Sequence, residues 1–256
     1  MDFEQIKKYW EERASFDSSA QSTTQDYFMR EIELCVMREQ IAKLKPVRVM
    51  DIGCGDARTT LGLASEFPMV RFYGGDYSES MVNNASNNIA ASGVKNINVQ
   101  VCDITQPLQI DKLELAYTMR CLINLPTWTL QKHAINHIYD ALAPHGYYVM
   151  IENFIEGQEN FNQVRAAFDL PPIPVRSHNL FFKRKELLKY ISSMFDVMEE
   201  VNISSTYYLV SRVIYSRLCK DKSLQPDYFD EHHRYAAGLP FSGEYGPVRM
   251  ICMRRQ

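Results

Sequence analysis

Short apolar runs alternate with amphipathic stretches through the middle of the chain. The apolar runs have the length of buried strands and lie at 47–52, 70–76, 97–103, 113–118 and 147–152. The stretches between them place apolar residues three or four positions apart, which predicts helices at 59–67, 78–91 and 129–142. Strands and helices in this order form a parallel sheet with right-handed crossovers and helices on both faces. The pattern therefore predicts an α/β fold.

The two ends of the chain follow a different pattern. Residues 1–45 are predicted to be helical and amphipathic, and 154–178, with three prolines, to be an irregular cap over the carboxyl edge of the sheet. A strand, a helix and a last strand are predicted at 195–204, 207–220 and 248–254. We therefore divide the chain into an amino-terminal helical lid at 1–45, an α/β core with the ligand site at 46–153, a cap on the side of a second ligand at 154–195, and a carboxyl-terminal part at 196–256 that completes the same domain.

Composition excludes several classes of protein. Aromatic residues make up 12% of the 256 residues, more than a disordered chain retains, and the net charge of −3 provides no overall positive field for nucleic acid. No apolar run approaches the roughly 20 residues of a membrane span, and the charged amino-terminus does not resemble a secretory signal. Six cysteines without a C-x-x-C pair favour reduced thiols. We expect a cytoplasmic protein without nucleic-acid or membrane partners; the sequence predicts no particular oligomeric state.

The histidines do not predict a metal site. His133 and His137 share one helix face at a spacing of four residues, but no third ligand accompanies them. His232 and His233 fall in a predicted loop. We interpret all four as solvated side chains.

The strongest chemical signal follows the first strand, where two glycines separate Asp51 from Asp56. Gly53 and Gly55 allow a ligand to lie against bare backbone, and the following helix offers unpaired N–H groups. A dinucleotide site would place a third glycine where this chain has Arg58. The two carboxylates would also repel a diphosphate, so the turn favours a cationic ligand.

Carboxylates also close the next two strands. Asp76 ends the second strand, where a carboxylate accepts hydrogen bonds from both hydroxyls of a ribose, in this fold as in NAD-binding proteins. Asp103 ends the third strand, where it is placed to accept from an adenine amine. Each aspartate alone is as easily structural, but together they indicate a site for a positively charged adenosine derivative.

These residues resemble the class I S-adenosylmethionine-dependent methyltransferases. The matching segments are Asp51–Gly55, Asp76, Cys102-Asp103, Tyr117–Arg120 and the turn Leu142–Gly146. The resemblance is strong over residues 46–152 and looser at both ends. Ala57 stands in place of the family's third glycine, which is a small intrusion, and His145 stands where a second glycine is common.

The resemblance implies a Rossmann-like, seven-stranded mixed sheet whose last strand, 248–254, lies antiparallel beside the fifth. It also implies S-adenosyl-L-methionine as the cofactor, with Tyr77 or Ser78 beside the ribose and the backbone of Met119 beside the amino-acid part. Arg30 is a candidate partner of the cofactor's carboxylate, although a surface arginine is the simpler interpretation. The expected cofactor residues are Arg30, Asp51, Gly53, Gly55, Asp76, Tyr77, Ser78, Cys102, Asp103, Ile104 and Met119.

The acceptor of the methyl group is less strongly indicated. His178, just after the prolines, is the candidate general base, because a histidine titrates near operating pH; a helix-capping role explains it equally. The amino-terminal segment around Tyr9 and residues 18–25 resembles the mobile lid of some small-molecule members of the family. The other expected acceptor residues are Tyr9, Arg120, Glu152, Asn153, Asn162, Arg165, Asn179, Tyr207 and Arg212.

Several arginines near the predicted mouth suit an anionic or hydroxyl-rich acceptor. The sequence therefore predicts methyl transfer to a small molecule at oxygen, on a sugar or a phosphorylated intermediate. An RNA methyltransferase is one alternative, against which the acidic composition argues. A binding module without catalytic activity and an NAD-dependent oxidoreductase are the others.

Overall fold

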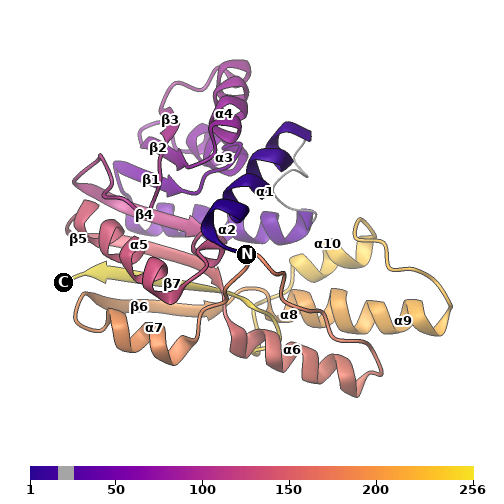
Figure 1. Ribbon diagram of the computed structural model, residues 1–256. Helices are drawn as coiled ribbons and strands as arrows, with labels where there is room; N and C mark the ends of the chain where they lie inside the picture. The colour runs from indigo at the N-terminus through magenta and orange to yellow at the C-terminus, as the bar shows by residue number, and fades with distance from the viewer. Residues whose placement is uncertain (17–25) are drawn as a thin grey trace.

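The computed structural model describes residues 1–16 and 26–256; the part of the predicted lid at 17–25 lies outside the described residues. Seven strands form one sheet in the order β3-β2-β1-β4-β5-β7-β6. Strands β1 to β5 run parallel, and β7 lies antiparallel between β5 and β6. This arrangement confirms the predicted Rossmann-like mixed sheet (Figure 1). The strands are β1 (Arg48–Ile52), β2 (Arg71–Asp76), β3 (Ile97–Val101), β4 (Leu113–Met119), β5 (Leu142–Asn153), β6 (Phe195–Asn202) and β7 (Val248–Arg255).

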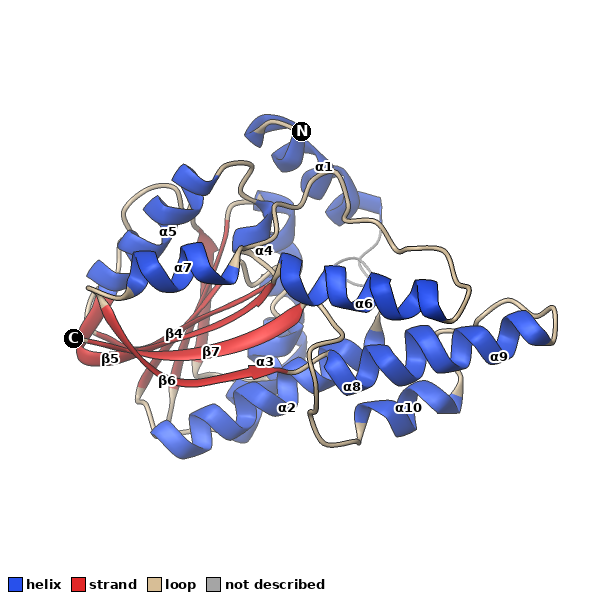
Figure 2. Ribbon diagram, turned by 90° about the horizontal axis from the view of Figure 1, so that it is seen from below, coloured by secondary structure: helices blue, strands red, loops and turns tan. Residues whose placement is uncertain are grey.

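Helices cover both faces of the sheet because each inner strand buries side chains on both sides. In β1, Val49 packs into the core under one face and Met50 into the core under the other. Figure 2 shows α2 and α3 on one side of the sheet and α5 and α7 on the other. These helices and α4 are α2 (Tyr27–Leu44), α3 (Arg58–Glu66), α4 (Glu79–Ser92), α5 (Trp128–Ala141) and α7 (Arg184–Ile191).

The remaining helices gather beyond the carboxyl ends of β4 and β5 (Figures 1 and 2). The helix predicted at 207–220 is a continuous run of three elements whose middle element, η2, has π-type hydrogen bonding. None of the helices in the described ranges is both long and apolar enough to cross a bilayer. The elements are α1 (Phe3–Phe16), η1 (Leu122–Asn124), α6 (Ile155–Ala167), α8 (Ser205–Tyr208), η2 (Leu209–Ile214), α9 (Tyr215–Asp221) and α10 (Glu231–Ala237).

The expectation of an irregular cap at 154–178 is wrong for its first half, which forms α6. Phe161 of α6 is fully buried against Leu170 and Val213, and the helix ends before Pro171, the first of the three prolines. Proline breaks a helix only where it occurs, so these prolines do not disturb the residues before them.

Three further expectations need correction. Residues 27–44 do not belong to a lid: α2 buries Met29, Val36 and Ile41 in the core under the sheet. Strand β5 begins at Leu142, within the segment predicted as a turn. His232 and His233 lie on α10 rather than in a loop, and His233 is buried among aromatic rings, because this short helix packs against α2 and α8.

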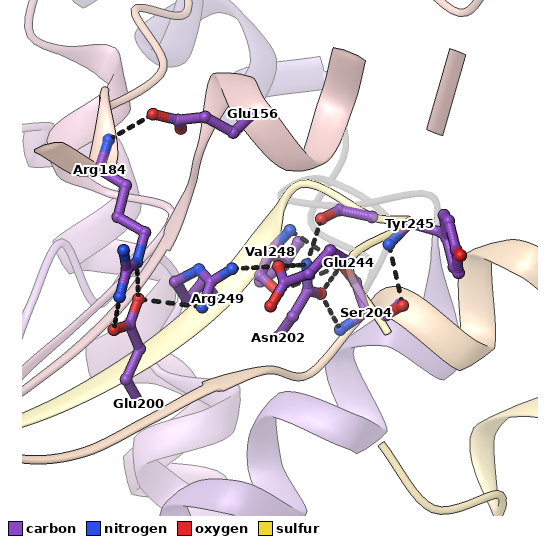
Figure 3. A network of polar contacts seen from close by, with 11 residues as sticks. Glu156, Arg184, Glu200, Asn202, Ser204, Glu244, Tyr245, Val248 and Arg249 are labelled. Carbon is purple, nitrogen blue, oxygen red and sulfur yellow. Dashed lines mark hydrogen bonds and ion pairs between the residues drawn. The ribbon is translucent and has the colours of Figure 1, made fainter. Parts of the chain in front are cut away.

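A polar network fixes the outer strands to the loop that precedes β7 (Figure 3). Arg249 on β7 donates to Glu200 on β6 over 2.9 Å and also contacts Glu244. Asn202 Nδ2 donates to the carbonyl of Gly246 over 2.7 Å, which holds the backbone just before Pro247. The network therefore sets the position of a loop that reaches the cavity described next.

Candidate active site

A cavity of about 380 Å³ opens at the carboxyl ends of β1, β4 and β5, where the order of the strands reverses. Two parts of its walls differ in chemistry. The glycine-turn half is formed by Asp51, Gly53, Gly55, Asp76, Tyr77, Met119 and Cys121. The arginine half is formed by Asp26, Arg30, Glu33, Arg120, Asn153, Tyr208, Arg212 and Tyr228.

The glycine turn is tight because its backbone bonds across to β2. The N–H groups of Gly53 and Cys54 both donate to the carbonyl of Gly75, over 2.7 and 3.1 Å. Gly53 has φ +79°, and a Cβ there would lie 2.4 Å from the Sγ of Cys121. Only glycine fits this position, and the turn therefore presents bare backbone to the cavity.

Asp76 is held at the end of β2 by two backbone groups. Its carboxylate accepts from Gly55 N over 2.9 Å and from Ser78 N over 3.0 Å. Burial raises the pKa of Asp76 to about 6, in spite of these two hydrogen bonds. The carboxylate is thus fixed against the glycine turn and ionised at neutral pH.

Asp51 supplies a second buried carboxylate to the same half. Its Oδ2 accepts from the Thr60 hydroxyl over 2.5 Å. Burial raises the pKa of Asp51 to about 7, although the hydroxyls of Thr60 and of the nearby Tyr117 lower it. The buried Oδ1 makes no hydrogen bond of ordinary geometry among the described residues. A buried carboxylate oxygen without a partner fits a ligand that brings a positive charge or an N–H donor.

The arginine half contains two ion pairs, each with one buried partner, Arg212 in one and Glu33 in the other. Arg212 Nη2 lies 2.6 Å from Asp26 Oδ2, and Arg120 Nε lies 2.7 Å from Glu33 Oε1. Burial raises the pKa of Glu33, against the opposing influence of Arg120. Asp26 and Glu33 were not expected from the sequence, although with Arg30 they form a charged i, i+4, i+7 row at the start of α2 that could have indicated them.

His178 lies in the wall between the cavity and α1. Its ring stacks on Tyr9 with centroids 4.6 Å apart and lies edge-on to Trp10 at 6.0 Å. Burial lowers the pKa of His178, and the positive charges of Arg176 and Arg13 lower it further. The imidazole is therefore neutral at neutral pH and able to accept a proton.

Most of the residues expected from the sequence meet at this cavity. From the expected cofactor set, its walls include Arg30, Asp51, Gly53, Gly55, Asp76, Tyr77 and Met119. From the expected acceptor set, they include Arg120, Asn153, His178, Asn179 and Arg212. The sequence analysis did not single out several other wall residues, namely Met81, Cys121, Gln158, Phe181 and Tyr228.

Four expected cofactor residues lie outside the cavity walls. Ser78 caps α4, accepting from Met81 N over 3.1 Å. Strand β3 ends at Val101, and Cys102, Asp103 and Ile104 follow it. Asp103 Oδ1 accepts from the backbone N–H and the hydroxyl of Thr105, so it closes a local turn. A contact between Asp103 and an adenine stays a prediction.

Glu152 does not face the mouth of the cavity as expected. It is fully buried, and its carboxylate accepts from the N–H groups of Cys121, Leu122 and Ile123 over 2.8 to 3.3 Å. Burial raises the pKa of Glu152 to about 7. Because these three donors occupy the carboxylate, Glu152 holds the turn after β4 in place rather than meeting a ligand.

Tyr9 and three other expected acceptor residues support the walls from behind. Asn162 exchanges two hydrogen bonds with the backbone of Ile173, over 3.0 and 3.1 Å. Arg165 Nε donates to the Pro171 carbonyl over 2.8 Å, and the hydroxyl of Tyr207 donates to Asp26 over 2.6 Å. These contacts fix wall residues, because Ile173 and Asp26 both line the cavity.

Comparisons with known proteins agree with this geometry. A family model described as a methyltransferase domain matches residues 43–206, more than half of the chain, so the chain belongs to the S-adenosylmethionine-dependent methyltransferases. The buried carboxylates and bare glycine turn fit S-adenosyl-L-methionine, the family's cofactor, which carries a positive charge on sulfur. No curated protein matches the sequence.

Solved structures of several chemistries share the fold. The N-methyltransferase NodS from Bradyrhizobium japonicum WM9, in complex with S-adenosyl-L-homocysteine, matches with a TM-score of 0.58 at 13% identity over 98% of each chain. The mitomycin 7-O-methyltransferase MmcR matches with a TM-score of 0.57 at 13% identity over 100% of this chain and 61% of its own. The [4+2]-cyclase SpnF matches with a TM-score of 0.58 at 17% identity over 86% and 80%. At these identities the likeness shows the fold alone.

The raised pKa of Asp76 predicts a pH dependence of cofactor binding. Ionised Asp76 accepts hydrogen bonds and protonated Asp76 does so poorly, so the Kd for S-adenosyl-L-homocysteine should rise as pH falls below about 6, by up to about tenfold per pH unit. The free energy of unfolding should change in the opposite direction. The pKa of Asp76 in the folded protein lies above the ordinary 3.8, so protonation of Asp76 favours folding, and this contribution is lost as pH rises from 3.8 toward 6. Calorimetric titration between pH 5 and 8 tests this. A Kd independent of pH would contradict it.

Proposed function

We propose that this methyltransferase transfers the methyl group to an oxygen of a small molecule, with sugars and phosphorylated compounds as the acceptor classes to test first. S-adenosyl-L-methionine, when bound, supplies a methyl group already activated on a positively charged sulfur. The chain's own residues then have to hold the acceptor and take up its proton. A small-molecule acceptor and a cytoplasmic location stay predictions.

The observation that carries this proposal is the position of His178 and Asn153 on the walls of the same cavity as the acidic glycine turn. Asn153 Oδ1 is buried and has no hydrogen-bond partner in the described part of the chain, so a hydroxyl group would satisfy it. His178 has a lowered pKa and is ready to accept the proton of a second acceptor hydroxyl, the one whose oxygen forms the new bond to the methyl group as the bond from carbon to sulfur breaks. The remaining cavity walls contribute by holding the reacting groups in line.

The test is incubation of the purified protein with methyl-labelled S-adenosyl-L-methionine and panels of acceptors, followed by mass spectrometry. Sugars, sugar phosphates and their amino-substituted counterparts form the panels, with transfer RNA as a separate arm. Methylation of a hydroxyl supports the proposal, and methylation of an amine or of RNA overturns it. Tight cofactor binding without turnover on any arm would favour the alternative of a binding module.

Replacement of His178 by alanine should lower kcat by about 10²–10⁴-fold, the usual contribution of a general base. The Kd for S-adenosyl-L-homocysteine should stay unchanged, because His178 does not belong to the glycine-turn half. In the wild type, kcat should fall on the acid side of pH 6.5, the ordinary pKa that burial lowers here.

A matched control is His133→Ala, because His133 is exposed on α5 and away from the cavity walls. That variant should keep the wild-type kcat and pH profile. Unchanged turnover in His178→Ala would reduce His178 to a packing partner of Tyr9.

A further inference from the structure

Arg212 has an unusual environment for a charged side chain on a cavity wall. It is only 6% exposed, and its guanidinium carbon lies 4.2 Å from the ring centre of Tyr228, with the rings of Tyr207 and Tyr208 at 5.6 and 5.8 Å. Its Nη2 pairs with Asp26 over 2.6 Å. The low exposure of Arg212 and the rings around it shield the guanidinium from water, which strengthens its polar contacts.

Around this ion pair the carboxylate oxygens of Asp26 are all occupied, whereas one N–H group of Arg212 is not. Asp26 is saturated: Oδ2 accepts from Arg212, and Oδ1 accepts from the Tyr207 hydroxyl over 2.6 Å and from Met29 N over 3.2 Å. Arg212 Nη1, in contrast, is buried without a hydrogen-bond partner among the described residues. A buried N–H group in this situation favours a ligand oxygen.

A second buried arginine lies directly behind Arg212. Arg165 is 6% exposed and donates to two carbonyl oxygens, those of Pro171 and Arg212. No carboxylate in the described ranges forms an ion pair with it. Its guanidinium carbon also lies 5.6 Å from the ring centre of Phe161. Burial of a positive charge costs free energy when its partners are carbonyl groups and an aromatic ring rather than a carboxylate. An anion bound nearby would reduce that cost.

The charges of the arginine half point in the same direction. Three arginines (Arg30, Arg120 and Arg212) face two acids (Asp26 and Glu33), and Arg165 lies behind them. Burial lowers the pKa of Arg30; among its charged neighbours Asp56 and Glu33 raise that pKa, and Arg120 lowers it. Within the arginine half the arginines thus outnumber the carboxylates by one, and Asp56 beside it offsets part of the charge of Arg30.

We infer that the acceptor is bound through an anionic oxygen group, a carboxylate or a phosphate, seated beside Arg212. This inference rests on the proposed function and narrows it, because it favours phosphorylated or carboxylated acceptors over neutral sugars. Arg212 supplies the donor at Nη1, and Arg165 acts through Arg212 as a positioning residue. The glycine-turn half, which is lined by Asp51 and Asp76, is then left for the positively charged cofactor.

The experiment titrates inorganic phosphate and, separately, acetate into the protein saturated with S-adenosyl-L-homocysteine, and follows the Tm. Sodium chloride at equal ionic strength corrects for general salt effects. At least one of the two anions should raise the Tm beyond the chloride control, and the arm that does so identifies the group as phosphate or carboxylate. An anion Kd follows from the dependence of Tm on concentration.

The deciding variant is Arg212→Lys, which keeps a positive charge for Asp26 but loses the forked N–H donors. We expect an anion Kd about tenfold higher than in the wild type, with the Kd for S-adenosyl-L-homocysteine unchanged. Arg71→Lys is the control and should behave as the wild type, because Arg71 is exposed at the amino-terminal end of β2 and does not line the cavity.

Two results would overturn the inference: anions that shift the Tm no more than chloride, or an Arg212→Lys variant with the wild-type anion Kd. Failure of the proposed function looks different, because it would show as methylation of an amine or of RNA even though the anion binds. If the wild-type protein did not bind S-adenosyl-L-homocysteine, the proposed function would be rejected before any anion is titrated.

Discussion

Replacement of Asp76 by alanine is expected to raise the Kd for S-adenosyl-L-homocysteine by about 10- to 150-fold. The variant removes a buried carboxylate, and hydrogen bonds to charged groups contribute about 1.5–3 kcal/mol each. Asp76 is a strong candidate for binding the cofactor because hydrogen bonds from Gly55 N and Ser78 N already fix its carboxylate on the cavity wall. The side chain therefore loses little conformational freedom when a ligand binds.

Calorimetric titration measures this Kd, and circular dichroism checks that the variant folds. The matched control is Asp140→Ala, because Asp140 is an exposed aspartate on α5 and does not line the cavity. It should bind as the wild type does. Wild-type affinity in Asp76→Ala would mean that the ribose hydroxyls of the ligand are bound by other groups.

Replacement of Gly157 by alanine is expected to lower the free energy of unfolding by about 1–3 kcal/mol, the cost of overpacking a tight contact. A Cβ at Gly157 would lie 2.1 Å from the carbonyl oxygen of Gly246. That carbonyl cannot move away freely, because Asn202 Nδ2 donates to it over 2.7 Å within the network of Figure 3. Helix α6 must therefore separate from the loop before β7.

The same substitution at Gly62 provides the control with the opposite sign. Gly62 lies inside α3, and a Cβ there would meet Leu34 at an ordinary 3.9 Å. Alanine is favoured over glycine in a helix by about 1 kcal/mol, so Gly62→Ala should raise the Tm while Gly157→Ala lowers it by several degrees. Thermal unfolding of the two variants measures both Tm values. Shifts of the two Tm values in the same direction would contradict the prediction.

The glycine-turn half could be predicted almost completely, because its residues follow strand ends in the sequence. Asp51, Gly53 and Gly55 come from one short segment, and Asp76 closes the next strand. Parallel strands bring such ends to one edge of the sheet by construction. The expected position of the cofactor therefore follows from local patterns and the order of the strands.

The arginine half could be predicted only in part. Arg120, Asn153 and Arg212 were expected near the acceptor, but Glu152, Asn162 and Tyr207 were expected there for the same reasons and support the walls instead. Side chains near a strand end or on a helix have the same sequence signature whether they face a cavity or the backbone behind it. Their direction depends on how α6, α8 and η2 pack against one another.

The sequence by itself determined the mixed sheet, the glycine turn and the carboxylates at the strand ends, since periodicity and turn chemistry act over a few residues. Only the tertiary structure decided that Asp26 pairs with Arg212, 186 residues further along the chain, and that α6 replaces much of an expected loop. Such pairs depend on burial and on the packing of distant helices, and no local spacing in the chain records either of them.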